Sequence, residues 1–104
     1  MIEAEIYKAL GDPVRLTMVK RLASGSPSTI GELSKNLDIS RQGARKQLQV
    51  LVSANVVSLA PQGRETMVTL NAKALQIARN FIAKIELQWD QRLESLKNFA
   101  ENKD

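Results

Sequence analysis

The side chains with the clearest chemical potential lie in one stretch, residues 39–51. Its amide and basic residues recur at intervals of three and four positions: Gln42, Arg45, Lys46 and Gln49. In an α-helix this spacing places them on one face. Arginine and lysine suit phosphates and guanine edges, and glutamine suits adenine edges. The pattern therefore predicts a helix that reads DNA, with Gln42, Arg45 and Lys46 as the candidates for base contacts.

The other face of this helix is apolar, with Ala44, Leu48, Leu51 and Val52. Ser40 is placed to cap the first turn, because its hydroxyl can accept from free backbone N–H groups. Helix N-termini favour phosphates, so we expect phosphate contacts at Thr29, Ser40 and Arg41. Gln49 lies further along the helix and is expected to meet the DNA backbone or solvent.

The distribution of charge favours the same interpretation. The 104 residues carry a net charge of +4, which is compatible with nucleic acid but not specific for it. Residues 39–64 contain no Asp or Glu, yet Arg41, Arg45, Lys46 and Arg64 all lie there. The alternative is a basic face that only meets solvent.

Composition removes several classes of function. The chain has no cysteine and no histidine, so disulfides and thiolate metal sites are excluded and the commonest general base is missing. We therefore expect no enzyme, no cofactor and no transition metal. No apolar run approaches the roughly 20 residues of a membrane span, and residues 1–5 lack the pattern of a signal peptide. A cytoplasmic protein is expected.

The first part of the chain predicts two helices. Residues 2–10 form an amphipathic pattern, which Gly11 ends. Asp12 can cap a second helix to about Ala23, with Pro13 at its first position. Ser24-Gly25-Ser26-Pro27 reads as a turn or a short extended link.

Thr29 and Glu32 form a capping-box pattern, which predicts a third helix. Its apolar residues Ile30, Leu33 and Leu37 indicate an end near Asp38, about two residues before the helix that starts at Ser40. Two helices joined by so short a turn match a helix-turn-helix, although an ordinary helical hairpin is the alternative.

The second half predicts a hairpin and a long helix. Strands are expected at 56–60 and 65–70, joined by a turn at 61–64 with Arg64 at its tip. Arg64 could reach a minor groove or a phosphate, or it could be a solvated turn residue. Asn71 can cap a helix from about 72 to 100. The fold class is thus mainly α with a small β-hairpin, a winged helix-turn-helix of order α-α-α-α-β-β-α. Residues 1–100 form one domain, and 101–104 form a frayed tail.

The first and last helices carry more apolar surface than one small core can use, which predicts a homodimer. The last helix has apolar residues alternating at three and four, a pattern typical of a helix-packing seam. The alternative is that this helix folds back onto its own core. The expected dimer residues are Ile2, Ile6, Leu10, Ile82, Ile85, Trp89, Leu93 and Leu96.

This sequence resembles the ArsR-type winged-helix repressors of bacteria over nearly its whole length. The resemblance lies in residues 9–15 (Ala-Leu-Gly-Asp-Pro-Val-Arg), 29–34 (Thr-Ile-Gly-Glu-Leu-Ser), 39–51, and Gly63-Arg64. It implies a DNA-binding homodimer that represses transcription, with dimer contacts through the first and last helices. Ser40 matches the family's capping serine, Arg41, Gln42, Arg45 and Lys46 match its groove-facing positions, and Gly63 and Arg64 match its wing tip.

The chain also departs from this family. Members often have Ser where Arg45 stands, and many carry a His at the position of Lys46 or Gln47, so the operator cannot be carried over. Metal-sensing members have a Cys pair near Thr29, or Asp and His ligands on the last helix, where this chain has only carboxylates: Glu86, Asp90, Glu94 and Glu101. These read as solvated ion-pair partners.

The resemblance is therefore to the branch of the family without metal ligands. The sequence predicts a metal-independent, sequence-specific regulator that binds double-stranded DNA as a homodimer, with its small-molecule or protein effector unknown. The alternative function is a winged-helix protein-interaction module that does not bind DNA.

Overall fold

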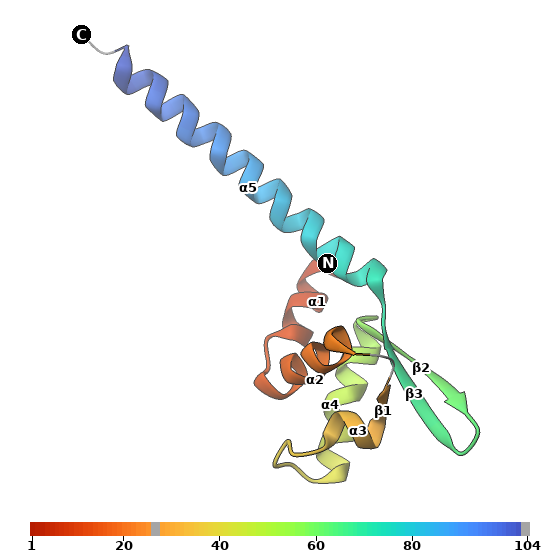
Figure 1. Cartoon of the computed structure of the whole chain (residues 1–104). Helices are drawn as coiled ribbons and strands as arrows, with labels where there is room; N and C mark the ends of the chain where they lie inside the picture. Colours follow the sequence, from red (N-terminus) through yellow and green to blue (C-terminus); the bar gives the residue numbers. More distant parts are fainter. Residues whose placement is uncertain (26–27, 103–104) are drawn as a thin grey trace.

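The computed structural model describes residues 1–25 and 28–102. Helices and a small antiparallel sheet form one globular part, from which the last helix projects (Figure 1). The elements are α1 (Ile2–Leu10), α2 (Pro13–Ser24), β1 (Ser28–Thr29), α3 (Ile30–Ser34), α4 (Arg41–Ser53), β2 (Val57–Gln62), β3 (Glu65–Leu70) and α5 (Ala72–Glu101). The expected fold class, mainly α with a β-hairpin wing, is confirmed. The predicted turn residues Ser26 and Pro27 lie outside the described residues.

The sheet has three strands in the order β1-β3-β2, one more than the hairpin that the sequence predicts. β1 is only two residues long and pairs Ser28 with Val68 of β3. The hairpin turn is also tighter than predicted, because β2 continues through Pro61 to Gln62. Pro61 is tolerated there because β2 is an edge strand. Gly63 takes a φ of 65°, a left-handed conformation that glycine adopts without strain.

The third helix is shorter than predicted. It ends at Ser34 rather than near Asp38, and residues 35–40 form the link to α4. Two residues of that link, Asn36 (φ 62°) and Asp38 (φ 61°), adopt the left-handed conformation that Asn and Asp tolerate best. The Arg21 guanidinium of α2 stabilises this early end, since it donates to the carbonyl oxygens of Leu33 (2.9 Å) and Lys35 (2.6 Å).

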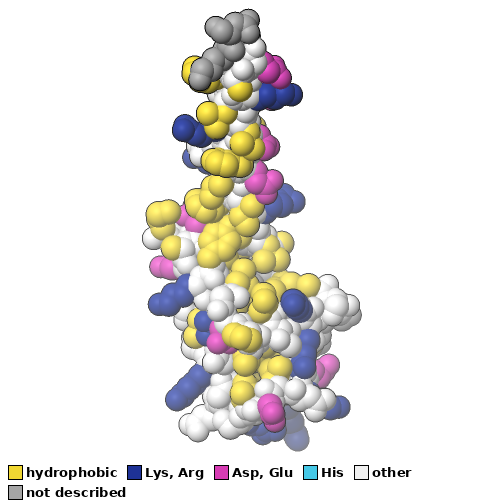
Figure 2. All heavy atoms as spheres, turned by 90° about the vertical axis from the view of Figure 1, so that its left-hand side faces the viewer, with side chains coloured by type: hydrophobic (Ala, Val, Ile, Leu, Met, Phe, Trp, Pro, Cys, Tyr) yellow, Lys and Arg dark blue, Asp and Glu magenta, His cyan; other side chains and the backbone are white. Residues whose placement is uncertain are grey.

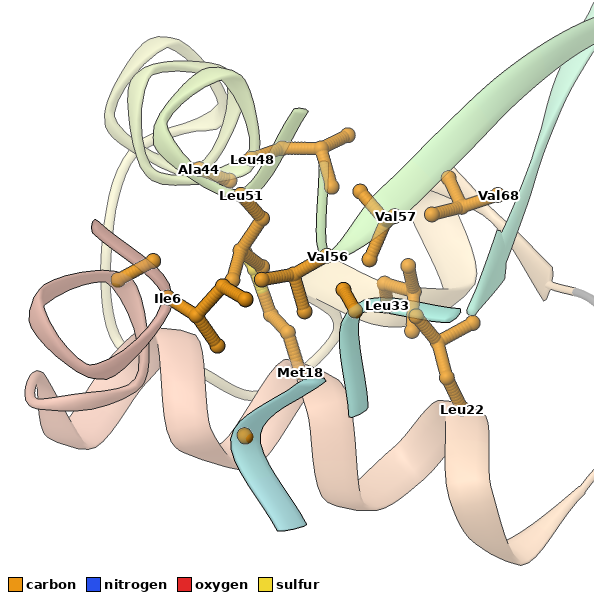
Figure 3. Packing of buried hydrophobic residues seen from close by; sticks show 13 residues of the cluster. Ile6, Met18, Leu22, Leu33, Ala44, Leu48, Leu51, Val56, Val57 and Val68 are labelled. Carbon is orange, nitrogen blue, oxygen red and sulfur yellow. The ribbon is translucent and has the colours of Figure 1, made fainter. Parts of the chain in front are cut away.

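The core lies between the helices and the inner face of the sheet (Figure 3). Ile6 of α1, Met18 of α2 and Leu51 of α4 meet at its centre. No polar or charged side chain is buried among the residues that the structure describes. Ile6 is only 1% exposed. The prediction that Ile6 contacts a dimer partner is therefore wrong, because its side chain is buried in the core of its own chain.

The last helix does not fold back onto this core. Ala74 and Ala78 are buried at its start, whereas every residue from Ile82 to Asn102 is exposed. The radius of gyration is 19.2 Å, while a compact chain of this length would give about 13 Å. A stripe of hydrophobic side chains runs along the projecting helix, flanked by charged residues (Figure 2). The alternative in which α5 packs entirely on its own core is therefore wrong.

The base of α5 is held by α1. The Tyr7 hydroxyl donates to the carbonyl oxygen of Ala78, and the rings of Tyr7 and Phe81 lie with centroids 5.8 Å apart. These contacts fix the direction in which α5 leaves the globular part. The helix itself continues through Glu101, so the predicted frayed tail does not include that residue, while Lys103 and Asp104 lie outside the described residues.

Candidate nucleic-acid interface

Helix α4 is stopped by specific backbone hydrogen bonds at both ends. At its start the Ser40 hydroxyl accepts from the Gly43 N–H at 2.9 Å, as the sequence predicts. At its end Asn55 takes a φ of 61°, and the N–H groups of Asn55 and Val56 donate to the carbonyls of Val52 (3.0 Å) and Leu51 (2.9 Å). This is a Schellman motif, which satisfies carbonyls that the helix cannot pair internally. The position and length of α4 are thus encoded locally.

Gly43 has a steric role in the first turn of α4. A Cβ atom at this position would lie 3.2 Å from the Ser40 Oγ, which is tighter than an ordinary contact. Glycine therefore leaves room for the cap. This explains a residue that otherwise costs up to about 1 kcal/mol relative to alanine inside a helix.

The two faces of α4 differ as predicted. Ala44, Leu48 and Leu51 are buried against the core. The opposite face exposes Arg41, Gln42, Arg45, Lys46 and Gln49. Within the described part of the chain, none of these five side chains has a hydrogen-bond or ion-pair partner. The structure thus brings five predicted site residues together on one surface whose donors are unused.

Arg45 occupies the centre of this surface. One open hollow lies between Arg41, Gln42 and Arg45. A second hollow separates α4 from the sheet and is lined by Ile30, Arg45, Leu48, Gln49, Leu59 and Thr66. Arg45 lines both, so its guanidinium can reach a ligand that enters from either side.

Two predicted residues belong to parts of the chain other than α4. Arg64 is exposed in the turn between β2 and β3, at the end of the hairpin that extends away from the helices (Figure 1). Thr29 is half-buried at the N-cap of α3, where its hydroxyl accepts from the Glu32 N–H and also contacts the Glu32 carboxylate. These bonds show that Thr29 caps α3. The phosphate contact predicted for Thr29 stays a prediction, and the neighbouring carboxylate does not favour it.

Two arginines connect the helices in ways that the sequence patterns do not predict. Arg21 holds the end of α3, as described above. Arg15 of α2 donates to two carbonyl oxygens of α1 and to the Gln47 side chain of α4. Residue spacing predicts only that an arginine on a helix faces solvent. It cannot predict the partners of Arg15, which lie 6 to 32 positions away in the sequence. Only Arg15's place in the 9–15 motif could have drawn attention to it.

Known proteins are similar to this chain in sequence and in fold. A family model described as a helix-turn-helix domain matches residues 10–60, which run from the last residue of α1 into β2. The HTH-type transcriptional regulator Rv2034 of Mycobacterium tuberculosis is 36% identical over 73 residues, covering 70% of this chain and 67% of that protein. An ArsR-like transcriptional regulator from Rhodococcus sp. RHA1 superposes with a TM-score of 0.83 at 26% identity, covering 98% of this chain and 95% of that one. The chain belongs to the ArsR family of winged helix-turn-helix transcriptional regulators.

Other similarities agree with this ArsR assignment, and the resemblance read from the sequence is confirmed. The transcriptional repressor SdpR of Bacillus subtilis is 29% identical over 77 residues, covering 74% of this chain and 84% of SdpR. The transcriptional repressor BigR from Xylella fastidiosa is 30% identical with a TM-score of 0.61, covering 77% of this chain and 82% of BigR. The homodimeric winged helix-turn-helix domain of Mb0332 from Mycobacterium bovis shares the fold at 23% identity, with a TM-score of 0.61 and coverage of 88% and 82%.

Two further observations bear on partners. Among residues 1–25 and 28–102, no group of three or more acidic side chains is placed to hold a metal ion. In the same part of the chain, none of the helices combines the length and the apolar character that crossing a membrane requires.

Proposed function

We propose that this ArsR-family protein is a homodimeric, metal-independent repressor that reads a pseudo-palindromic operator in double-stranded DNA. The observation that carries the proposal is the exposed face of α4, where basic and amide side chains have no partner within the described part of the chain. Unused donors beside a capped helix start fit the major groove, which admits one α-helix and presents acceptors on guanine and adenine.

Each residue of this face is given a role by its position. Gln42, Arg45 and Lys46 point from the first two turns and would meet base edges. Ser40 and Arg41 stand at the helix start, where the dipole favours a phosphate. Gln49, further along, would meet the DNA backbone. Arg64 on the wing would reach a neighbouring minor groove or phosphate.

The dimer is proposed from α5. A single chain leaves the hydrophobic stripe of this helix in water, which is unfavourable over a surface of this extent. A second copy would cover it in a twofold arrangement. The homodimeric domain of Mb0332 shares this fold, which supports the same assembly here. The proposed contacts are Ile2, Leu10, Ile82, Ile85, Trp89, Leu93 and Leu96.

Metal independence and repression are proposed on separate grounds. Without histidine or cysteine, the chain lacks the ligands that transition metals prefer. The carboxylates of α5 alternate with Lys84, Arg92 and Lys97, which suits ion pairs better than a metal site. The similarity to the repressors SdpR and BigR supports repression. A protein of this kind would act in the cytoplasm, where bacterial DNA lies.

Salt dependence tests whether the protein binds DNA at all. If Arg41 and Arg64 of two protomers each neutralise a phosphate, affinity should fall at least about 100-fold between 50 and 200 mM salt. The measurement is fluorescence anisotropy of labelled duplex DNA. Arg41→Ala should lower the slope of log affinity against log salt by about 2 per dimer. Lys84→Ala, on the polar side of α5, is the matched control and should leave the slope unchanged. An affinity that does not respond to salt would refute the proposal and favour a protein-interaction module.

A further inference from the structure

The side chain of Arg15 binds three acceptors on two different helices. From α2, its Nε donates to the carbonyl oxygen of Ala9 at 2.7 Å and its Nη2 to that of Lys8 at 3.2 Å. Its Nη1 donates to the Oε1 of Gln47 at 2.6 Å. One half-buried guanidinium therefore joins the end of α1 to the middle of α4.

These bonds do what the apolar contacts of α4 cannot do alone. Ala44, Leu48 and Leu51 hold α4 against the core, but burial of apolar surface is not directional. Charge-assisted hydrogen bonds from a planar guanidinium are directional. Gln47 directly follows Lys46, so a constraint on Gln47 limits how far α4 can rotate about its own axis. Such rotation would move Arg45 and Lys46 relative to any bound groove.

The other end of the bridge lies on a proposed dimer element. Lys8 and Ala9 belong to the last turn of α1, whose Ile2 and Leu10 are proposed dimer contacts, and α1 also holds the base of α5 through Tyr7. The orientation of α4 within each protomer is thus linked to the helices that would set the twofold axis.

We propose that Arg15 is a positioning residue for DNA recognition, acting through Gln47. The bridge fixes the recognition helix α4 relative to α1, and hence fixes the distance between the two α4 helices of the dimer. This inference rests on the proposed function, because it assumes that a dimer reads two half-sites. Its consequence is a strict requirement for half-site spacing, which is separate from base recognition by Arg45 and from the strength of phosphate binding.

The test replaces Gln47 by methionine, which keeps the length of the side chain but removes the acceptor. Affinity is measured for the operator, for the operator with one base pair inserted between its half-sites, and for random DNA. Wild-type protein should bind the inserted operator about tenfold more weakly or worse than the operator itself. Gln47→Met should lose most of this preference, while its affinity for random DNA stays within about twofold of wild type, since phosphate contacts are untouched.

Two further variants distinguish positioning from a loss of folding. Gln47→Glu keeps an acceptor for Arg15 and should retain the spacing preference, although its charge weakens absolute affinity. Gln91→Met makes the same substitution at an exposed site of α5 and should behave as wild type. The inference would be overturned if Gln47→Met kept the spacing preference of the wild type. It would also be overturned if Gln47→Met and Gln47→Glu lost the spacing preference to the same extent. Failure of the wild type to bind DNA would instead refute the proposed function.

Discussion

Replacing Arg45 by alanine should weaken binding to the operator about 5- to 150-fold per half-site, whereas binding to random DNA should fall much less. A bidentate contact between arginine and guanine contributes about 1–3 kcal/mol of discrimination, which corresponds to this range. Arg45 is the residue that should show the effect most strongly, because it lines both hollows of the α4 surface and has no partner within the described chain.

The contrast with Arg41 makes the Arg45 experiment specific. Arg41→Ala removes the same charge, but from the helix start, so it should weaken operator and random DNA to a similar extent. Arg45→Lys keeps the charge and loses the planar fork, so it should still lose discrimination. Both affinities can be measured by competition binding at one fixed salt concentration. Equal losses on operator and random DNA for Arg45→Ala would show that Arg45 contacts phosphates rather than bases.

Replacing Trp89 by alanine should raise the dissociation constant of the dimer at least about 30-fold. Buried aromatic side chains are enriched among interface residues whose truncation costs 2 kcal/mol or more, and about 1.4 kcal/mol corresponds to a factor of ten. Trp89 lies in the middle of the hydrophobic stripe of α5, is 57% exposed in the single chain and contributes nothing to the chain's own core. Its loss should therefore affect association far more than folding.

Leu87 provides the matched control for Trp89. It lies two residues away and is 59% exposed, but at about 100° per residue it faces the opposite side of the helix. Leu87→Ala should leave the dissociation constant unchanged within about twofold, since it lies outside the proposed interface. Sedimentation equilibrium across low micromolar concentrations measures both variants. If Trp89→Ala remained as dimeric as wild type, the partner-facing side of α5 would have to be reassigned.

The parts of the fold that the sequence predicts correctly are those encoded locally. Asp12, Thr29, Ser40 and Asn71 all accept backbone N–H groups at the helix starts where their types indicate caps. The face of α4 follows from residue spacing alone. The hydrophobic seam of α5 also follows from residue spacing. Its exposure follows from the number of apolar residues in the chain, which is larger than one small core can bury.

The errors occur where distant segments decide the outcome. The apolar spacing of Ile30, Leu33 and Leu37 suits a longer helix. In the structure, however, the Arg21 guanidinium donates to carbonyl oxygens at the end of α3, and Asn36 adopts a left-handed conformation that ends the helix. Strand β1 is too short for any local pattern and exists because β3 offers a free edge. Ile2 and Ile6 lie on the same face of α1. Only the packed structure shows that Ile6 is buried in the core while Ile2 remains exposed.

In the candidate site, too, only the locally encoded part could be predicted from the sequence. Its surface residues could be predicted because residues three or four positions apart on a helix must lie together. The bridge from Arg15 to Gln47 could not be predicted, since it joins residues 32 positions apart through a side chain that propensity treats as solvated. The contacts that orient the α4 surface are therefore harder to predict from the sequence than the residues of the surface itself.

Two copies of α4 should read DNA as a twofold pair, and footprinting of the bound DNA is the most direct test. The protein should protect an inverted repeat whose half-sites are centred one helical turn apart, about 10 to 10.5 base pairs. Protection should disappear in Arg45→Ala at a concentration where Lys84→Ala still protects. Protection of a single unrepeated site, or none at low salt, would contradict the account.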